Sequence, residues 1–166
     1  QMQKMGEIYE KGQGVPRDDG EAARWYLRAA EHARKRPPPQ EPVALWFKLG
    51  ELYEQGKGLP KDSAQALEWY KKAANSRMVV AQVRLGTIYE TGLYVPKDYT
   101  EAARYYRAAA SVGYPDGQYR LALLYQRGWG VQLDHVEAVT LLQQAAGKGH
   151  IEALFALGLA YEQGYG

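Results

Sequence analysis

The sequence contains five copies of one short helical pattern, and the even spacing of these copies constrains the fold more than any other feature. Each copy places a small residue three positions before a tyrosine; these small residues are Gly6, Gly50, Gly86, Ala122 and Gly158. The last four follow one another at steps of 36 residues, whereas the first step is 44 residues, one repeat plus an insertion of eight. A period of this length is typical of solenoids, in which each unit buries its apolar face only by stacking on its neighbours. The pattern therefore predicts an extended binding surface and not a catalytic pocket.

Residues 79–114 show how one repeat is built. Apolar residues recur with helical spacing from Val79 to Tyr89, which predicts a first helix over about residues 79–91 that ends at Gly92. Residues 93–98 then form a turn, in which a proline restricts the backbone as the chain reverses. A second helix follows, so each repeat is predicted to be an antiparallel helix pair and the fold class is predicted to be all-α.

Each of four turns closes with an aspartate three residues before a glutamate or glutamine. The pairs are Asp18 with Glu21, Asp62 with Gln65, Asp98 with Glu101, and Asp134 with Glu137. This spacing is typical of a capping box at the start of a helix. We expect the aspartate to accept a hydrogen bond from an amide of the first turn. The glutamate or glutamine side chain is expected to reach back to the amide of the aspartate.

Small residues on both helices predict close packing within each pair. The second helices combine pairs of alanines with Trp, Tyr or Leu, as in the series Ala102, Ala103, Tyr105 and Tyr106. We expect the two helix backbones to touch at the small residue of the first helix, for example at Gly86, while large side chains fill the space around it. Because the aromatic residues recur in register with these small residues, we interpret them as core and not as a ligand-stacking stripe.

The repeats divide the chain into one continuous array over residues 1–166. Its predicted parts are a partial repeat 1–36, an insertion 31–42, repeats at about 43–78, 79–114 and 115–150, and a partial repeat 151–166. Because the first and last repeats are incomplete, we expect the sequence to be a piece of a longer array. The insertion combines a basic cluster with three prolines at positions 37–39, which predicts a longer loop with an extended segment.

The 36-residue helix pairs resemble the Sel-1-like repeat family, which is related to the tetratricopeptide repeats. The matching motifs are L-G-x-x-Y, then G-x-G-V-P-x-D, then E-A-x-x-W-Y-x-x-A-A, with mild departures at Ala122, Tyr94 and Gln132. The resemblance implies a right-handed α-solenoid whose concave face is lined by the first helices, and a role as a scaffold or adaptor. Some bacterial members are rich in cysteine, with disulfides joining each helix pair, and a few were linked to β-lactam binding. This chain contains no cysteine.

Composition argues against several classes of partner. The 21 basic and 19 acidic side chains are mixed along the chain, which leaves no basic stripe for a phosphate backbone, so nucleic acid is not an expected partner. No apolar run approaches the roughly 20 residues of a membrane-spanning helix, so membrane insertion is not expected either. Another protein or peptide remains the expected partner.

The sequence offers no convergent catalytic set, and we predict a non-enzymatic protein without cofactor or metal. The three histidines, His32, His135 and His150, lack a second ligand at helical spacing. Few serines are present, and none lies in a nucleophile-elbow pattern; we expect Ser76 to cap a first helix.

The predicted binding residues lie on the first helices, on the side that should face the groove of the solenoid. Counted from the small residue, side chains at three before, one after and four after share one face and are not expected to pack within the pair. The site residues in this register are Phe47, Glu51, Glu54, Val83, Thr87, Glu90, Tyr119 and Leu123, and the same register gives Gln126, Phe155, Leu159 and Glu162. The site also includes Arg84 and Arg127, which together with Lys48 and Arg120 are expected to give the groove a basic edge. Apolar centres flanked by charges of both signs suit an extended peptide or a helix.

Two other functions stay open at this point. Exposed aromatics such as Trp129 and Tyr94 could stack on sugars, which would make the protein a bacterial envelope module that binds glycan or peptidoglycan. A hydrolase acting on amide or β-lactam bonds is the other alternative. Burial of the groove residues against the next repeat would remove the predicted site.

Overall fold

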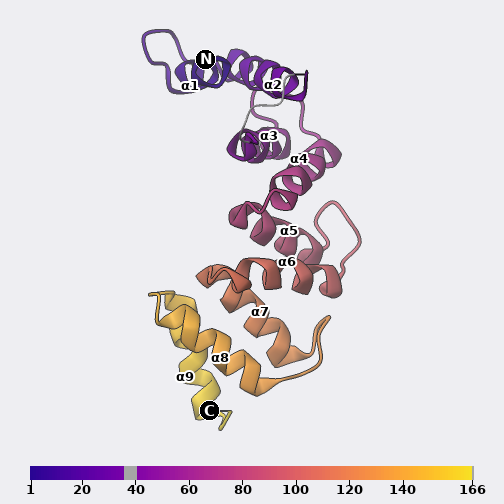
Figure 1. Cartoon of the computed structure of the whole chain (residues 1–166), viewed down its shortest axis with the longest axis vertical. Coiled ribbons are helices and arrows are strands. Elements are labelled where there is room, and N and C mark those ends of the chain that lie inside the picture. Colours follow the sequence, from indigo (N-terminus) through magenta and orange to yellow (C-terminus); the bar gives the residue numbers. More distant parts are fainter. Residues whose placement is uncertain (36–40, 166) are drawn as a thin grey trace. The chain divides into compact units, whose positions relative to one another are not determined.

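The computed structural model describes residues 1–35 and 41–165, and within these ranges it contains nine α-helices and no strand (Figure 1). The helices are α1 (Met2–Lys11), α2 (Asp19–Lys35), α3 (Val43–Gln55), α4 (Ser63–Asn75), α5 (Val79–Thr91), α6 (Tyr99–Ser111), α7 (Pro115–Arg127), α8 (His135–Ala146) and α9 (Ile151–Glu162). The all-α class is therefore confirmed, and the predicted first helix over residues 79–91 coincides with α5.

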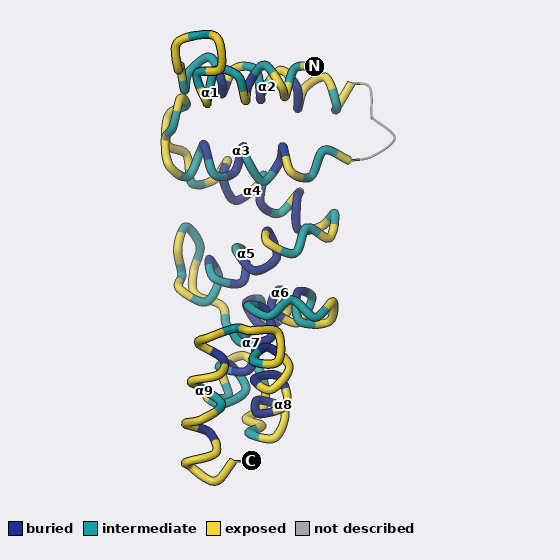
Figure 2. Tube along the Cα trace, turned by 90° about the vertical axis from the view of Figure 1, so that its left-hand side faces the viewer, coloured by how far each residue is buried: buried dark blue, intermediate teal, exposed yellow. Residues whose placement is uncertain are grey.

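The chain divides into two units, Gln1–Ala81 and Gln82–Gly166. In the first unit, α1 packs on α2 and α3 packs on α4. In the second unit, α7 packs on both α6 and α8, and α9 packs on α8. In both units the buried positions lie along the helices and the turns between paired helices are exposed (Figure 2). Each unit therefore consists of helix pairs with local contacts, as stacking repeats require.

The first helices α1, α3, α5 and α7 end at glycine, as the sequence predicts. Gly12, Gly56 and Gly128 adopt the left-handed conformation after α1, α3 and α7, and Gly92 follows α5 with φ of 75°. In each case the glycine amide donates a hydrogen bond to the carbonyl four residues earlier. Because glycine enters this backbone region without steric cost, it stops the helix and starts the turn.

Only one half of the predicted capping box is present. The aspartates accept hydrogen bonds from the amides of Glu21, Gln65, Glu101 and Glu137 at 2.9–3.0 Å. The prediction for the reverse bond is wrong, because each aspartate amide instead donates to the carbonyl of the tyrosine in the preceding first helix, as Asp98 does to Tyr89 at 2.9 Å. Two of the glutamate side chains instead form ion pairs, Glu21 with Arg24, and Glu101 with Arg104 at 2.8 Å.

In the first three helix pairs a tyrosine ring, and not a helix backbone, occupies the space beside the first-helix glycine. A methyl group at Gly6 would lie 2.6 Å from Cε1 of Tyr26, and one at Gly50 would lie 2.6 Å from Cε1 of Tyr70. At Gly86 it would lie 2.5 Å from Cδ1 of Tyr106. The predicted backbone contact is therefore corrected. The glycines are needed because a buried phenol ring lies directly against the first helix.

In the fourth pair other residues stand at both positions of the glycine–tyrosine contact. Ala122 stands where the other pairs have glycine, and Leu142 stands where they have tyrosine. Both are fully buried. A leucine leaves room for the alanine methyl group that a tyrosine ring would exclude, so the two substitutions compensate each other in volume.

Two local predictions require correction. The insertion at residues 31–42 does not begin as a loop, because α2 continues to Lys35 and Lys35 pairs with Glu31 at 2.8 Å. The three prolines lie outside the described residues. Ser76 does not cap a first helix; it is the C-cap of α4, since its amide donates to carbonyls of that helix.

Candidate protein-interaction surface

Several predicted groove residues are engaged inside the helix pairs. Within each of the first three pairs the tyrosine beside the glycine donates its hydroxyl hydrogen to a glutamate near the end of the first helix. Tyr26 bonds Glu10 at 2.9 Å, Tyr70 bonds Glu54 at 2.8 Å, and Tyr106 bonds Glu90 at 2.6 Å. Burial and this hydrogen bond both raise the pKa of Tyr106 above its ordinary value. These glutamates therefore hold buried phenols in place.

A cation from the following first helix joins this arrangement within each unit. Lys48 of α3 donates to Glu10 at 2.6 Å, and Lys57 lies 3.4 Å from the same carboxylate. Arg120 of α7 approaches Glu90 at 3.8 Å. Burial raises the pKa of the Glu10 carboxyl, but hydrogen bonds from Lys48 and Tyr26 outweigh it, so its pKa is lowered. The basic edge expected along the groove is thus partly used to link one helix pair to the next.

The expectation that the predicted residues do not pack within the pair is wrong for most of those on α3 and α5. The ring of Phe47 lies 5.3 Å from that of Tyr70, Val83 is buried, and the Thr87 hydroxyl oxygen lies 3.2 Å from the hydroxyl oxygen of Tyr106. Glu51 and Arg84 are half-buried. The reason is that the tyrosine of the second helix reaches across to the face that the helical register assigned to the groove.

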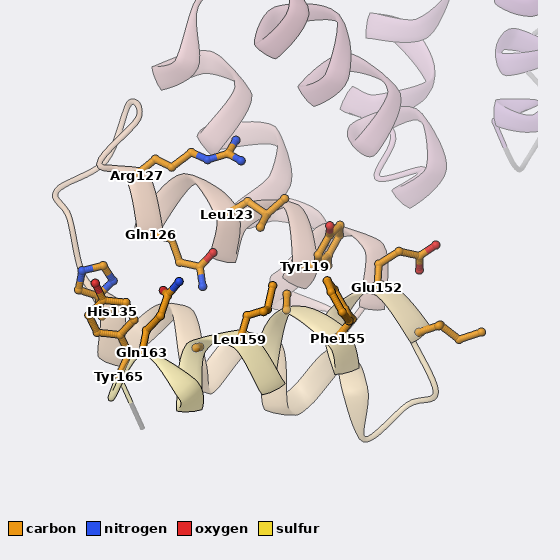
Figure 3. A pocket seen from close by; sticks show the side chains of 13 residues that line it. Tyr119, Leu123, Gln126, Arg127, His135, Glu152, Phe155, Leu159, Gln163 and Tyr165 are labelled. Carbon is orange, nitrogen blue, oxygen red and sulfur yellow. The ribbon is translucent and has the colours of Figure 1, made fainter.

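On α7 the predicted residues face a groove instead. Tyr119, Leu123 and Arg127 line a hollow of about 640 Å³ together with residues of α9 (Figure 3). Figure 3 shows Tyr119 and Phe155 pointing toward each other, with Leu123 and Leu159 farther along. Phe155 is 71% exposed, so the groove presents a large apolar side chain to solvent. Leu142 stands at the tyrosine position of this pair, so the paired helix α8 places no phenol on this face of α7.

Polar groups lie at the two ends of this groove. Arg127 and Glu152 are at opposite ends in Figure 3, and Gln126 and Gln163 lie between α7 and the end of α9. The Arg127 guanidinium lies 4.6 Å from the centre of the Trp129 ring, which limits its motion. An apolar floor with one cation and one carboxylate at its ends suits a peptide or a helix.

Two of the three histidines contact residues that line the groove. His150 caps α9, since its Nδ1 accepts a hydrogen bond from the Ala153 amide at 3.1 Å, and its ring lies 4.9 Å from that of Tyr119. His135 stacks on Tyr165 at 3.8 Å. Within residues 1–35 and 41–165 no cluster of three or more His, Asp or Glu side chains could hold a metal ion. The histidines thus have structural roles at the groove.

Sequence reasoning did not find the contributions of His135, Ile151, Glu152 and Tyr165 to this groove. Ile151 and Glu152 lie in the first turn of α9, one helical turn before Phe155, and this spacing could have identified them. His135 and Tyr165 come from other elements and carry no signal in the repeat register.

The aromatic residues considered for sugar stacking do not form an open platform. The Trp129 ring stacks on Tyr99 at 4.7 Å and also contacts Arg127. Tyr94 takes the place of a turn glycine with φ of 73° and is itself engaged in a contact within the protein. Neither observation supports a glycan-binding module.

Comparison with known proteins identifies the repeats. The family model described as Sel1 repeat matches residues 2–33, 47–77, 79–114, 115–150 and 151–166. No match is found among curated proteins. Sel1 repeats generally serve as protein–protein interaction modules. In the described part of the chain, no helix has the length and apolar character needed to cross a membrane.

Solved structures agree with this family match. The crystal structure of c5321, a protective antigen of uropathogenic Escherichia coli with an SLR fold, is 35% identical with a TM-score of 0.87 over 98% of this chain and 33% of that chain. A Sel1 repeat protein from Oxalobacter formigenes is 35% identical with a TM-score of 0.82, over 98% of this chain and 63% of that chain. Cysteine-rich protein B of Helicobacter pylori shares the fold at 24% identity and a TM-score of 0.59. The chain thus spans a third to under two thirds of the first two proteins.

Proposed function

Because the chain belongs to the Sel1 repeat family, we propose that it is a non-enzymatic scaffold that binds a partner protein or peptide through the groove between α7 and α9. Tyr119, Leu123 and Arg127 of this groove are among the first-helix residues that the sequence predicts to face a partner. Its partner is a segment with apolar side chains that rest on Tyr119, Leu123 and Phe155.

The observation that supports this proposal most is the contrast between the helix pairs. On α3 and α5 the glutamates and neighbouring side chains of the first-helix face hold the tyrosine of the second helix. On α7 no phenol covers the face, and the groove keeps exposed apolar side chains with polar groups at its ends. Unused apolar surface rimmed by polar groups is a mark of interaction sites.

The charged groups at the two ends of the groove indicate which charges a partner should carry. An acidic group is favoured beside Arg127 and a basic group beside Glu152, with an apolar stretch between them. Aromatic and arginine side chains are the most frequent hot spots at such interfaces, and Tyr119, Phe155 and Arg127 supply both types.

The test is selection of peptides from a displayed library on the wild-type chain, followed by titration of the selected peptides against two variants. Tyr119→Ala should weaken binding about tenfold to hundredfold, since truncation of a hot spot costs about 1–3 kcal/mol. The matched control is Arg107→Ala, an exposed residue of α6 outside the groove. Selected peptides that lose affinity only in Arg107→Ala would place the site elsewhere and contradict the proposal.

A further inference from the structure

A second pocket, of about 350 Å³, lies in the second unit between the second helices α6 and α8 and is lined by residues of α6, α7 and α8. Leu121 and Leu141 form its apolar part, and Tyr125 and Glu137 contribute polar groups. The pocket shares no lining residue with the groove between α7 and α9. The second helices on both of its sides are present, so its openness does not arise at an end of the sequence.

The repeat register shows which side chain leaves this pocket open. Leu141 of α8 stands two repeats after Trp69 of α4. The Trp69 side chain packs against the core of the first unit, which includes Leu49, the counterpart of Leu121. Because leucine is smaller than tryptophan, the space that an indole fills in the first unit stays open in the second.

The helix pair α5–α6 shows which groups occupy the corresponding face when it is complete. Glu101 forms an ion pair with Arg104 at 2.8 Å, and the Arg104 guanidinium lies 4.0 Å from the centre of the Tyr105 ring. The Tyr105 ring in turn stacks on Tyr89 of α5, with 5.8 Å between the ring centres. A carboxylate, a cation and two aromatic rings therefore form one continuous arrangement.

The helix pair α7–α8 keeps the first and last of these groups and lacks the two between them. The corresponding positions in α8 are Glu137, Thr140 and Leu141, and the ring on α7 is Tyr125. The Thr140 hydroxyl donates to the Val136 carbonyl at 3.0 Å, and it carries no charge to replace the arginine. The pocket therefore presents a carboxylate and an aromatic ring whose counterparts in α5–α6 contact an arginine and a tyrosine.

We propose that this pocket binds a segment of a partner protein in which an arginine is next to an aromatic residue, with the guanidinium on Glu137 and the ring on Tyr125. The carboxylate favours a cation, and an arginine can pair with it while its planar group lies over a ring. On the α6 side the Arg107 guanidinium lies 3.3 Å from the Tyr125 hydroxyl, and its charge favours an acidic group of the segment there. The site goes beyond the proposed groove and does not depend on it.

The probe for this site is the capped dipeptide acetyl-Arg-Tyr-amide, which is titrated into the isotope-labelled chain and followed by two-dimensional NMR. We expect saturable shifts of the backbone amides of Ser111, Tyr125 and Glu137, which lie around the pocket. Acetyl-Ala-Tyr-amide lacks the cation and should bind about twofold to fivefold more weakly, as expected for loss of an exposed ion pair. Acetyl-Arg-Ala-amide lacks the ring and should bind about twofold to tenfold more weakly, as expected for loss of an aromatic pair.

Matched protein variants locate the binding of the dipeptide. Leu141→Trp should abolish binding, because an indole at this position fills the pocket as it does in the first unit. Glu137→Gln should weaken binding about twofold to fivefold. Its control is Glu101→Gln, whose carboxylate already pairs with an arginine of its own helix, and this variant should bind like the wild type. Tyr119→Ala should also bind the dipeptide like the wild type, so that failure of the α7–α9 groove and failure of this pocket are told apart.

Three results would overturn the proposal. They are no saturable shifts around the pocket with acetyl-Arg-Tyr-amide, equal binding of this dipeptide to Glu137→Gln and to the wild type, or equal binding of acetyl-Ala-Tyr-amide. Circular dichroism checks that each variant is folded. Because Glu137→Gln changes only an exposed side chain, its comparison with the wild type stays decisive even where Leu141→Trp does not fold.

Discussion

Replacement of Gly86 by alanine tests whether a tyrosine ring, and not a helix backbone, determines the glycine of each first helix. The added methyl group would lie 2.5 Å from Cδ1 of Tyr106. The ring cannot move aside freely, because Tyr106 is 0% exposed and its hydroxyl donates to Glu90 at 2.6 Å. The substitution must therefore displace a buried ring together with its hydrogen bond to a carboxylate.

The expected cost follows from these contacts. Overpacking a core costs about 1–3 kcal/mol, and weakening a hydrogen bond to a charged group costs about 1.5–3 kcal/mol. The higher helix propensity of alanine offsets about 1 kcal/mol of this loss of stability. The free energy of unfolding should fall by about 2–4 kcal/mol, measured by urea denaturation followed by circular dichroism. The matched control, Gly158→Ala, should gain up to about 1 kcal/mol, because among the described residues no atom lies within 4 Å of the added methyl group.

The residues of the fourth helix pair suggest a second substitution that should restore the stability lost in Gly86→Ala. Ala122 and Leu142 replace the glycine and tyrosine in the fourth pair, so Gly86→Ala combined with Tyr106→Leu should be more stable than the sum of the single variants predicts. Unchanged stability in Gly86→Ala would refute the steric argument. Additive losses in the double variant would refute the proposed compensation.

Two further predictions concern the caps and the carboxylates. Asp98→Ala removes the oxygen that accepts a hydrogen bond from the Glu101 amide, so the free energy of unfolding should fall by about 0.5–2 kcal/mol in the same urea assay. Binding of the selected peptides should not change. Loss of peptide binding at unchanged stability would contradict a purely structural role of this cap. Because the pKa of Glu10 is lowered in the folded state, its ionised form stabilises the fold above the unfolded pKa, and this contribution is lost as pH falls through the folded pKa. The stability difference between wild type and Glu10→Gln should therefore shrink from about pH 6 to about pH 3, and a difference independent of pH would contradict the role of Lys48.

The sequence predicted the helix pairs well because their signals are local. Gly92 stops α5 and Asp98 starts α6 through contacts that span only a few residues, so spacing alone identifies them. The start of the insertion was harder to predict from the sequence, because α2 continues to Lys35, which forms an ion pair with Glu31 within the helix. A helix end without a glycine has no such local signal.

The candidate site could be predicted only in part. Helical register correctly grouped Tyr119 and Leu123, because both lie on one face of α7. It could not show that Tyr70 and Tyr106 reach across to Glu54 and Glu90, because that contact depends on the packing of a neighbouring helix. The matched changes at Ala122, Leu142 and Gln126 were present in the sequence, and they are the signal that would have separated structural glutamates from groove residues.

The links between neighbouring helix pairs also mean that the repeats of this chain are not interchangeable parts. Glu10 needs Lys48 from the next first helix, and Glu90 is approached in the same way by Arg120. In the fourth pair Gln126 stands at the position that Glu10 and Glu90 have in their pairs. In the next first helix, α9, Ala156 stands at the position of Lys48 and Arg120. Moving the fourth pair to an earlier place in the array would leave Glu90 without its cation and would put the uncharged Gln126 before the cation of the next first helix. These contacts therefore fix the place of the fourth pair, and any shortened or rearranged version of the array must keep those neighbours together.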